Sequence, residues 1–277
     1  MFQFSDKSSD KHIEEFHRQG FTVFRNIVPA KLIDELRDAC DQGVELARAK
    51  DGENAQRFQP ISAYEINQKP FEEFQNLPEI QDALARIFDF PFEMSGLDVL
   101  GVLLEPAKDA WCTQWHRDWR DNISGLDIEV WEAQYRNLQM FNQVNCALYE
   151  DSCTWVVPGS HLRLDTAEEV TRFPARPVES PQLEGLSAAQ RELACLEYCQ
   201  SMPGATRLFL NAGDYCLYRN SLWHLGNYIP YRKRATLHDG IMTTAFREYF
   251  TTAPKIAAER RDRGILWQNP NAARLAV

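Results

Sequence analysis

The chain has 277 residues, of which 44% are apolar and 25% charged, a balance typical of a soluble globular protein with a substantial core. Its formal net charge of -10 disfavours nucleic acid and anionic membranes as partners, because both attract basic surfaces. Residues 1–7 lack the pattern of a secretory signal, and no stretch approaches the roughly 18 apolar residues of a membrane span. We therefore expect a cytoplasmic protein that acts on small molecules, with no nucleic acid and no membrane as partner.

Seven cysteines are scattered along the chain, which is typical of reduced thiols rather than of a disulfide framework. Cys195 and Cys199 are four residues apart on a predicted helix. No second pair accompanies them, so a zinc site is not expected there.

The first ninety residues have the pattern of helices. A short helix is predicted over 9–18 and ends before Gly20, a residue suited to the left-handed conformation of a helix stop. The β-branched and aromatic residues of 21–25 predict a strand. From Pro29 onward apolar residues recur at helical spacing, and 78–88 predicts a further short helix.

From Phe92 onward the pattern changes to strands. They are predicted at Val99–Leu104, Gln114–Trp119, Leu138–Tyr149, Thr154–Val157, Arg207–Leu210, Tyr215–Tyr218 and Ala235–Thr244. Between the fourth and fifth lies an insertion, about 163–205, with a helix that starts at a Ser187–Gln190 capping box. The order predicts one α+β, mainly β domain over 1–277, with a helical part (about 1–90) and a β-sandwich or jelly-roll core (about 92–250).

The segment Trp115-His116-Arg117-Asp118-Trp119 carries the sharpest chemical signal. Residues i and i+2 of a strand share a face, so His116 and Asp118 can reach one metal ion while Arg117 points the other way. A second histidine would complete the two-histidine, one-carboxylate face that leaves positions open on iron(II) for oxygen activation. Taken alone, the pair is also typical of a surface histidine beside a solvated acid.

Three of the six histidines follow this pair in the chain. His161 closes a Pro-Gly turn, which is typical of a backbone-bonded turn residue, and His238 lies on a predicted strand as a buried, hydrogen-bonded side chain would. His224 is followed ten residues later by Arg234. An iron-bound 2-oxoglutarate needs a cation for its far carboxylate, and the planar fork of arginine binds carboxylates bidentately. The alternative for Arg234 is a solvated basic turn.

In their order and spacing, these motifs resemble the phytanoyl-CoA dioxygenase family of iron(II), 2-oxoglutarate-dependent oxygenases from Glu14 to Thr244. The resemblance rests on Phe16–Asn26 before a helix, Trp115–Asp118, Val156–His161 and the stretch from Gly213 through His224 to Arg234. It implies a double-stranded β-helix, a cupin-like jelly roll, flanked by N-terminal and inserted helices.

The resemblance also implies His116, Asp118 and His224 as the iron ligands and catalytic centre, and Arg234 as the clamp of the cosubstrate 2-oxoglutarate. The family's arginine usually lies one residue further from its distal histidine than Arg234 does. Arg232 is therefore the rival for the role of clamp.

Gln143 and Asn145 are polar residues on an otherwise apolar predicted strand expected beside the metal strand. We interpret them as further residues that bind 2-oxoglutarate; the alternative is an edge strand whose polar face meets water. Most tryptophans are expected to fill the core. Trp119 and Trp131 are candidates for walls of the substrate site.

The sequence thus predicts an iron(II)/2-oxoglutarate-dependent dioxygenase that uses O2 to hydroxylate an unactivated C–H bond of a small molecule, and converts 2-oxoglutarate into succinate and CO2. The carboxylate of Asp118 favours hydroxylation over halogenation, because a halide would need its coordination position. Desaturation and ring closure stay open. The alternative functions are a non-catalytic jelly roll that binds a metal or ligand, and a cupin-type oxygenase that does not use 2-oxoglutarate. A basic rim of Arg117, Arg120 and Arg136 would suit an acyl-CoA substrate, which net acidity disfavours.

Overall fold

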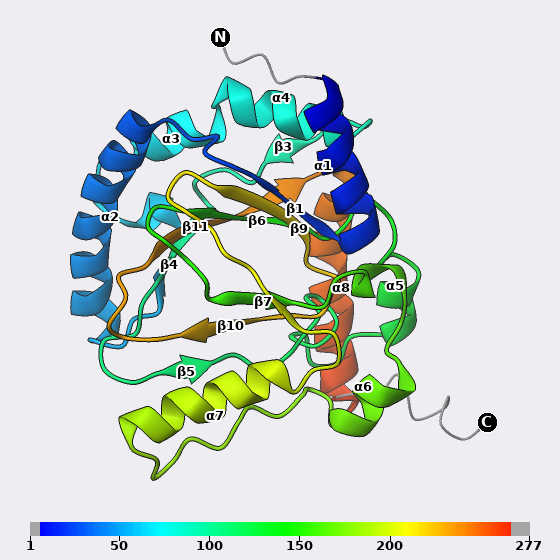
Figure 1. Cartoon of the computed structure of the whole chain (residues 1–277). Helices are drawn as coiled ribbons and strands as arrows, with labels where there is room; N and C mark the ends of the chain where they lie inside the picture. Colours follow the sequence, from blue (N-terminus) through cyan, green and yellow to red (C-terminus); the bar gives the residue numbers. More distant parts are fainter. Residues whose placement is uncertain (1–5, 267–277) are drawn as a thin grey trace.

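Two antiparallel β-sheets form the centre of the structure, a computed structural model that describes residues 6–266 (Figure 1). The larger sheet consists of β1 (Phe21–Phe24), β2 (Arg57–Phe58), β3 (Glu93–Met94), β4 (Gly101–Leu104), β6 (Asn142–Ala147), β9 (Tyr215–Arg219) and β11 (Ala235–Met242). The smaller sheet consists of β5 (Trp111–Cys112), β7 (Thr154–Val156), β8 (Thr206–Arg207) and β10 (His224–Tyr228).

The strand order is β1-β9-β6-β11-β4-β2 in the larger sheet, where β3 also pairs with β11, and β5-β10-β7-β8 in the smaller. The helices are α1 (Asp6–Gln19), α2 (Ala30–Asp51), η1 (Ile61–Ala63), α3 (Lys69–Gln75), α4 (Pro78–Ile87), α5 (Ile128–Glu132), η2 (Ser160–Leu162), α6 (Ala167–Arg172), α7 (Ala188–Gln200) and α8 (Thr244–Asp262). No helix within residues 6–266 is long and apolar enough to cross a membrane. Residues 1–5, part of the segment examined for a secretory signal, lie outside the described range.

Helices α1 to α4 cover the outer face of the larger sheet (Figure 1). Leu36 of α2 is fully buried there in one cluster with Val144 of β6 and Leu237 of β11. Because successive side chains of a strand point to opposite faces, this packing turns Asn145 and His238 toward the smaller sheet. The apolar pattern of the helices and strands thus places a row of polar side chains between the sheets.

The helical predictions at the N-terminus are confirmed. Gly20 has φ +85°, as expected for a left-handed helix stop, and α2 begins directly after Pro29. The insertion between β7 and β8 contains α6 and α7, and the Ser187–Gln190 capping box starts α7 as predicted. Helices α3, α5, α6 and α8 were not predicted individually.

The prediction of a strand at Gln114–Trp119 is wrong. Only His116 pairs there, through an isolated antiparallel bridge to His224, and the chain turns directly after Asp118. The amide of Asp121 donates to the carbonyl of Arg117 (3.0 Å), so the backbone groups that would extend a ladder are used by the turn. In its coarse form the fold prediction is confirmed, because helices surround two antiparallel sheets.

Candidate metal centre and its cavity

A cavity of about 340 Å³ lies between the two sheets. The larger sheet lines it with Gln143, Asn145, Tyr218 and His238, and β10 of the smaller sheet lines it with His224, Gly226 and Tyr228. The turn after β5 adds His116, Asp118 and Trp119. Sequence positions more than a hundred residues apart thus meet at one site.

His116, Asp118 and His224 offer three ligand atoms that all lie within 4.8 Å of one another. Nε2 of His116 is 3.5 Å from Oδ1 of Asp118, and Nε2 of His224 is 3.7 Å from Oδ2. The backbones of the two histidines exchange hydrogen bonds of 3.1 and 3.0 Å. The structure therefore brings together the three residues that the sequence predicted as metal ligands.

Each histidine ring is oriented by a carbonyl two residues before it. Nδ1 of His116 lies 2.8 Å from the carbonyl of Gln114, and Nδ1 of His224 lies 3.0 Å from that of Leu222. A carbonyl can only accept, so Nδ1 carries the proton and Nε2 keeps its lone pair toward Asp118. Burial, reinforced by the neighbouring His116, lowers the pKa of His224 to about 4. The neutral ring that a metal needs is therefore the dominant form of His224 at neutral pH.

Two asparagines hold the carboxylate of Asp118. Asn122 Nδ2 donates to Oδ1 (3.1 Å) and Asn220 Nδ2 donates to Oδ2 (3.2 Å). The backbone amide of Asp118 donates to the carbonyl of Asn220 (2.9 Å), and the indole of Trp131 donates to the carbonyl of Asp118 (3.0 Å). The sequence reasoning missed both asparagines, although Asn220 stands in the stretch that leads to His224.

Trp119 adopts φ +63°, a left-handed backbone conformation that is rare for an aromatic residue. Its amide donates to the side chain of Asn122 (2.8 Å), which closes the turn after Asp118. Its ring meets Phe246 and Phe250 of α8 edge-on, at centroid distances of 5.6 and 5.1 Å. Trp119 therefore forms part of the cavity wall, as predicted. Trp131 is fully buried and does not line the cavity, so its prediction as a substrate wall is wrong.

Arg234 lines the same cavity, whereas Arg232 does not. Nε of Arg234 donates to Oδ2 of Asp151 (2.8 Å), and Thr236 donates to the same oxygen. Burial raises the pKa of the Asp151 carboxyl, but Arg234 and Thr236 outweigh it and hold that pKa below its usual value. Nη1 of Arg234 is buried and has no hydrogen-bond partner within residues 6–266. One arm of the guanidinium is thus fixed and another is left without an acceptor.

Gln143 and Asn145 both line the cavity. Their strand, β6, lies between β9 and β11, so they do not belong to an edge strand that faces water. Gln143 accepts from the hydroxyl of Tyr218 (2.9 Å), and Asn145 Oδ1 lies 2.9 Å from Nδ1 of His238. The amides are therefore part of a polar inner face of the larger sheet.

Arg57 of β2 is a cavity residue that the sequence reasoning missed. It is exposed, its Nη1 donates to the side chain of Gln59 (3.3 Å), and no ion pair of Arg57 is found within the described part of the chain. The segment 51–75 is polar and irregular in sequence. A two-residue strand in it gives no periodic signal by which Arg57 could have been found.

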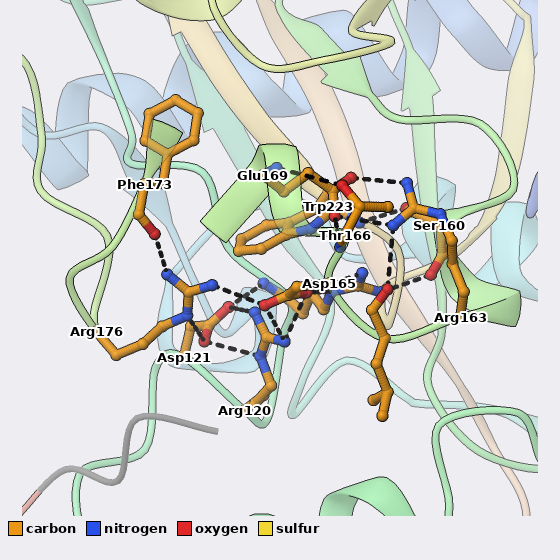
Figure 2. A network of polar contacts seen from close by, with 12 residues as sticks. Arg120, Asp121, Ser160, Arg163, Asp165, Thr166, Glu169, Phe173, Arg176 and Trp223 are labelled. Atoms are coloured by element: carbon orange, nitrogen blue, oxygen red, sulfur yellow. Dashed lines mark hydrogen bonds and ion pairs between the residues drawn. The ribbon is translucent and has the colours of Figure 1, made fainter. Parts of the chain in front are cut away.

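Behind the candidate ligands, a cluster of ions is sealed from solvent. It consists of Arg117, Arg120, Arg176, Asp121 and Asp165, whose side chains are 3% exposed or less. Figure 2 shows Arg120 and Arg176 converging on Asp121 and Asp165. We call these five residues the rear ion cluster.

The rear ion cluster is tied directly to the ligand-bearing segments. Arg117 Nη1 donates to the carbonyls of Ser160 (2.7 Å) and Ser221 (2.9 Å), and the Arg117 amide donates to Asp121. The guanidinium carbons of Arg117 and Arg120 lie 5.0 and 4.7 Å from the ring centre of Trp223. Arg117 points away from the metal site, as predicted.

The predicted basic rim is wrong, because Arg117 and Arg120 are buried in this cluster and only Arg136 is exposed. Their positive charge is matched by Asp121 and Asp165 rather than offered to a ligand. No local pattern in the sequence indicates that residue 165 folds back onto residue 117.

The chemistry of the donor set fits an iron(II) ion with a keto-acid cosubstrate. Two imidazole nitrogens and one carboxylate oxygen suit iron(II) and leave positions open for further ligands. The unpartnered Nη1 of Arg234 lines the same cavity and suits a carboxylate, because an arginine fork binds carboxylates in this way.

Comparison with known proteins gives one family. The model of the phytanoyl-CoA dioxygenase family (PhyH) matches residues 16–226, a range that contains His116, Asp118 and His224 and ends before Arg234. No curated protein sequence matches the chain.

Several solved structures are similar in fold. AviO1 from Streptomyces viridochromogenes Tue57 has a TM-score of 0.58 at 15% identity, over 86% of this chain and 96% of that one. The epimerase SnoN, solved with Fe3+, alpha ketoglutarate and nogalamycin RO, has a TM-score of 0.55 at 15% identity, over 86% and 84%. HygX from Streptomyces hygroscopicus, solved with nickel and 2-oxoglutarate, has a TM-score of 0.54 at 13% identity, over 84% and 86%.

Proposed function

The chain belongs to the phytanoyl-CoA dioxygenase family, and from this premise we propose that it is an iron(II)/2-oxoglutarate-dependent dioxygenase. The observation that carries the proposal is the convergence of His116, Asp118 and His224 on one point of a cavity that also contains Arg234. SnoN and HygX, which share the fold, were solved with 2-oxoglutarate and a metal ion.

In this proposal His116, Asp118 and His224 hold the iron, and Arg234 binds the distal carboxylate of 2-oxoglutarate. Iron(II) with 2-oxoglutarate supplies the activation of O2, with conversion of 2-oxoglutarate into succinate and CO2. Asn122 and Asn220 keep the carboxylate of Asp118 turned toward the histidines, since each donates to one of its oxygens.

The remaining cavity residues bind and orient the small molecules. Gln143 and Asn145 offer amide groups from the larger sheet, and Arg57 adds a cation without an ion-pair partner among the described residues. Trp119 covers the site from the side of α8, and so limits the access of water to the reacting bond.

The finer part of the proposal is the reaction and the architecture. We propose hydroxylation of an unactivated C–H bond of a small molecule, since the carboxylate of Asp118 would take the coordination position that a halide needs. We also propose that residues 1–277 form one domain, and that its two sheets form a double-stranded β-helix.

The test is turnover by the purified protein with iron(II), ascorbate and 2-oxoglutarate, followed as release of succinate. Even without substrate, slow uncoupled formation of succinate is expected. It should fall to background in His116→Ala, whereas His12→Ala, which changes a histidine on α1 far from the cavity, should retain it. Equal succinate release by wild type and His116→Ala would contradict the proposal.

A further inference from the structure

Tyr228 occupies the space that a side chain at residue 226 would need. His224, Gly226 and Tyr228 alternate along β10, so they share the face that lines the cavity. A Cβ atom at Gly226 would lie 1.9 Å from the phenolic oxygen of Tyr228 and 2.3 Å from its Cζ. The tyrosine therefore folds back over Gly226, and Gly226 is required by this packing rather than by its backbone conformation.

The ring of Tyr228 is held from two sides. Trp111 stacks on it with a centroid distance of 4.5 Å and an interplanar angle of 29°. The guanidinium carbon of Arg234 lies 4.9 Å from the ring centre. Such packing leaves the phenol little rotational freedom, so its hydroxyl is fixed in place before any ligand binds.

Two hydrogen-bond donors with unmet capacity thus stand beside each other in the cavity wall. Within residues 6–266, the hydroxyl of Tyr228 makes no hydrogen bond and the residue lines the cavity, whereas Nη1 of Arg234 is buried without a partner. Leaving the buried Nη1 without an acceptor costs free energy, which an acceptor entering the cavity would recover. One cationic donor and one neutral donor on the same wall match the two oxygens of a carboxylate.

We propose that Tyr228 and Arg234 together form the receptor for the distal carboxylate of 2-oxoglutarate, with Tyr228 donating its hydroxyl hydrogen to one carboxylate oxygen. This inference rests on the function proposed above and adds a residue to it. Tyr228 then selects keto acids that end in a second carboxylate. The plain alternative is that Tyr228 only fills space between Trp111 and Arg234.

The test is the affinity for keto acids, measured by calorimetry on protein loaded with nickel(II), so that no turnover occurs. Tyr228→Phe keeps the stacked ring and removes only the hydroxyl. A hydrogen bond to a charged group predicts that the Kd for 2-oxoglutarate rises about 10-fold or more. The Kd for 2-oxopentanoate, which has the same chain length and no distal carboxylate, is expected to stay within about 2-fold.

Tyr215→Phe is the matched control. The Tyr215 hydroxyl likewise makes no hydrogen bond within the described residues, but it is buried in the core between the larger sheet and its helices, away from the cavity. Its removal is expected to leave both Kd values unchanged. Gly226→Ala places a methyl group where the phenol lies, so it should weaken 2-oxoglutarate binding at least as much as Tyr228→Phe does. In a Tyr228→Val background the same alanine should cost nothing further.

The outcomes separate this inference from the proposed function. If wild type binds 2-oxoglutarate and Tyr228→Phe binds it equally well, or loses both keto acids alike, the role of Tyr228 is overturned and the proposed function stands. If nickel-loaded wild type binds no 2-oxoglutarate at all, both are overturned.

Discussion

The two sides of the segment that carries His116 and Asp118 differ in how their charged groups are paired. On the rear side, Asp165 alone receives hydrogen bonds or ion pairs from Arg117, Arg120 and Arg176. On the cavity side, donors such as Nη1 of Arg234 have no acceptor among the described residues. Nη2 of Arg117 and Nε of Arg176 also make no hydrogen bond within the described residues, so the difference lies in the ion pairs of the rear ion cluster and not in complete hydrogen bonding. We infer that the rear side holds the ligand-bearing segments in place, while the cavity side is left open for ligands.

The largest effect is expected from a variant that disrupts the rear ion cluster. Asp165→Ala should lower the free energy of unfolding by about 3–5 kcal/mol, because three buried guanidinium groups lose a shared partner. Chemical denaturation measures the change. Asp41→Ala removes an exposed carboxylate from its pair with Lys233 and should cost less than about 1 kcal/mol. Similar losses in both variants would contradict the distinction.

The second prediction concerns protonation beside the rear ion cluster. Burial, with the charge of Arg219, lowers the pKa of His161 to about 4 from 6.5. As pH falls from 6.5 toward 4, the His161 imidazole becomes protonated in the unfolded chain but stays neutral in the folded chain. The free energy of unfolding therefore decreases across this pH range. For His161 the loss amounts to about 3 kcal/mol at pH 4.

Unfolding of His161→Asn measured at several pH values between 7 and 4 tests this. His12, His224 and His238 also have lowered pKa values, so the variant should lose a part of the pH dependence of wild type and keep the rest. If the slope of the free energy of unfolding against pH is the same as in wild type, His161 becomes protonated in the folded chain as readily as in the unfolded chain, and the prediction is wrong.

The third prediction concerns the cavity side, where Asp118 is a candidate metal ligand. Asn220 Nδ2 donates to the carboxylate of Asp118, and Asn220→Ala should weaken binding of nickel(II) or cobalt(II) about 10- to 100-fold, as losses of residues that orient a metal ligand typically do. Calorimetry with the metal alone measures this. Asn137→Ala changes an exposed side chain that bonds only to Gln134 and to the amide of Gln139, so this variant should bind the metal like wild type.

The smallest effect is expected from one neutral hydrogen bond of the cavity wall. Tyr218→Phe removes the donor to Gln143 and should lower stability by about 1 kcal/mol. Thermal unfolding measures it. A loss as large as that of Asp165→Ala would show that the cavity wall is as tightly coupled as the rear ion cluster.

The sequence predicted those features that depend on local pattern. The i, i+2 spacing of His116 and Asp118 placed them on one side of the chain, although the segment proved to be a turn and not a strand. The capping box at Ser187 located the start of a helix, because capping is a local hydrogen-bond pattern.

Features that depend on distant pairing could not be predicted. Strand β10 was missed, since Gly226 and Asn227 are poor strand formers and only pairing with β7 and β5 makes them extended. The arginines near the metal motif suggested a basic rim. Their charge is neutralised by Asp121 and by Asp165, and Asp165 reaches them only through the fold of the insertion.

The reciprocal backbone hydrogen bonds between His116 and His224 also bear on the order of folding events. These residues are more than a hundred positions apart, and the loop between them contains β6 to β9 and the helical insertion. Closing such a loop costs entropy before the contacts at its ends form, and contacts of this kind slow folding. We therefore expect the complete ligand set to form late in folding, after this loop has closed, since His116 and Asp118 alone offer a metal ion two of the three ligands.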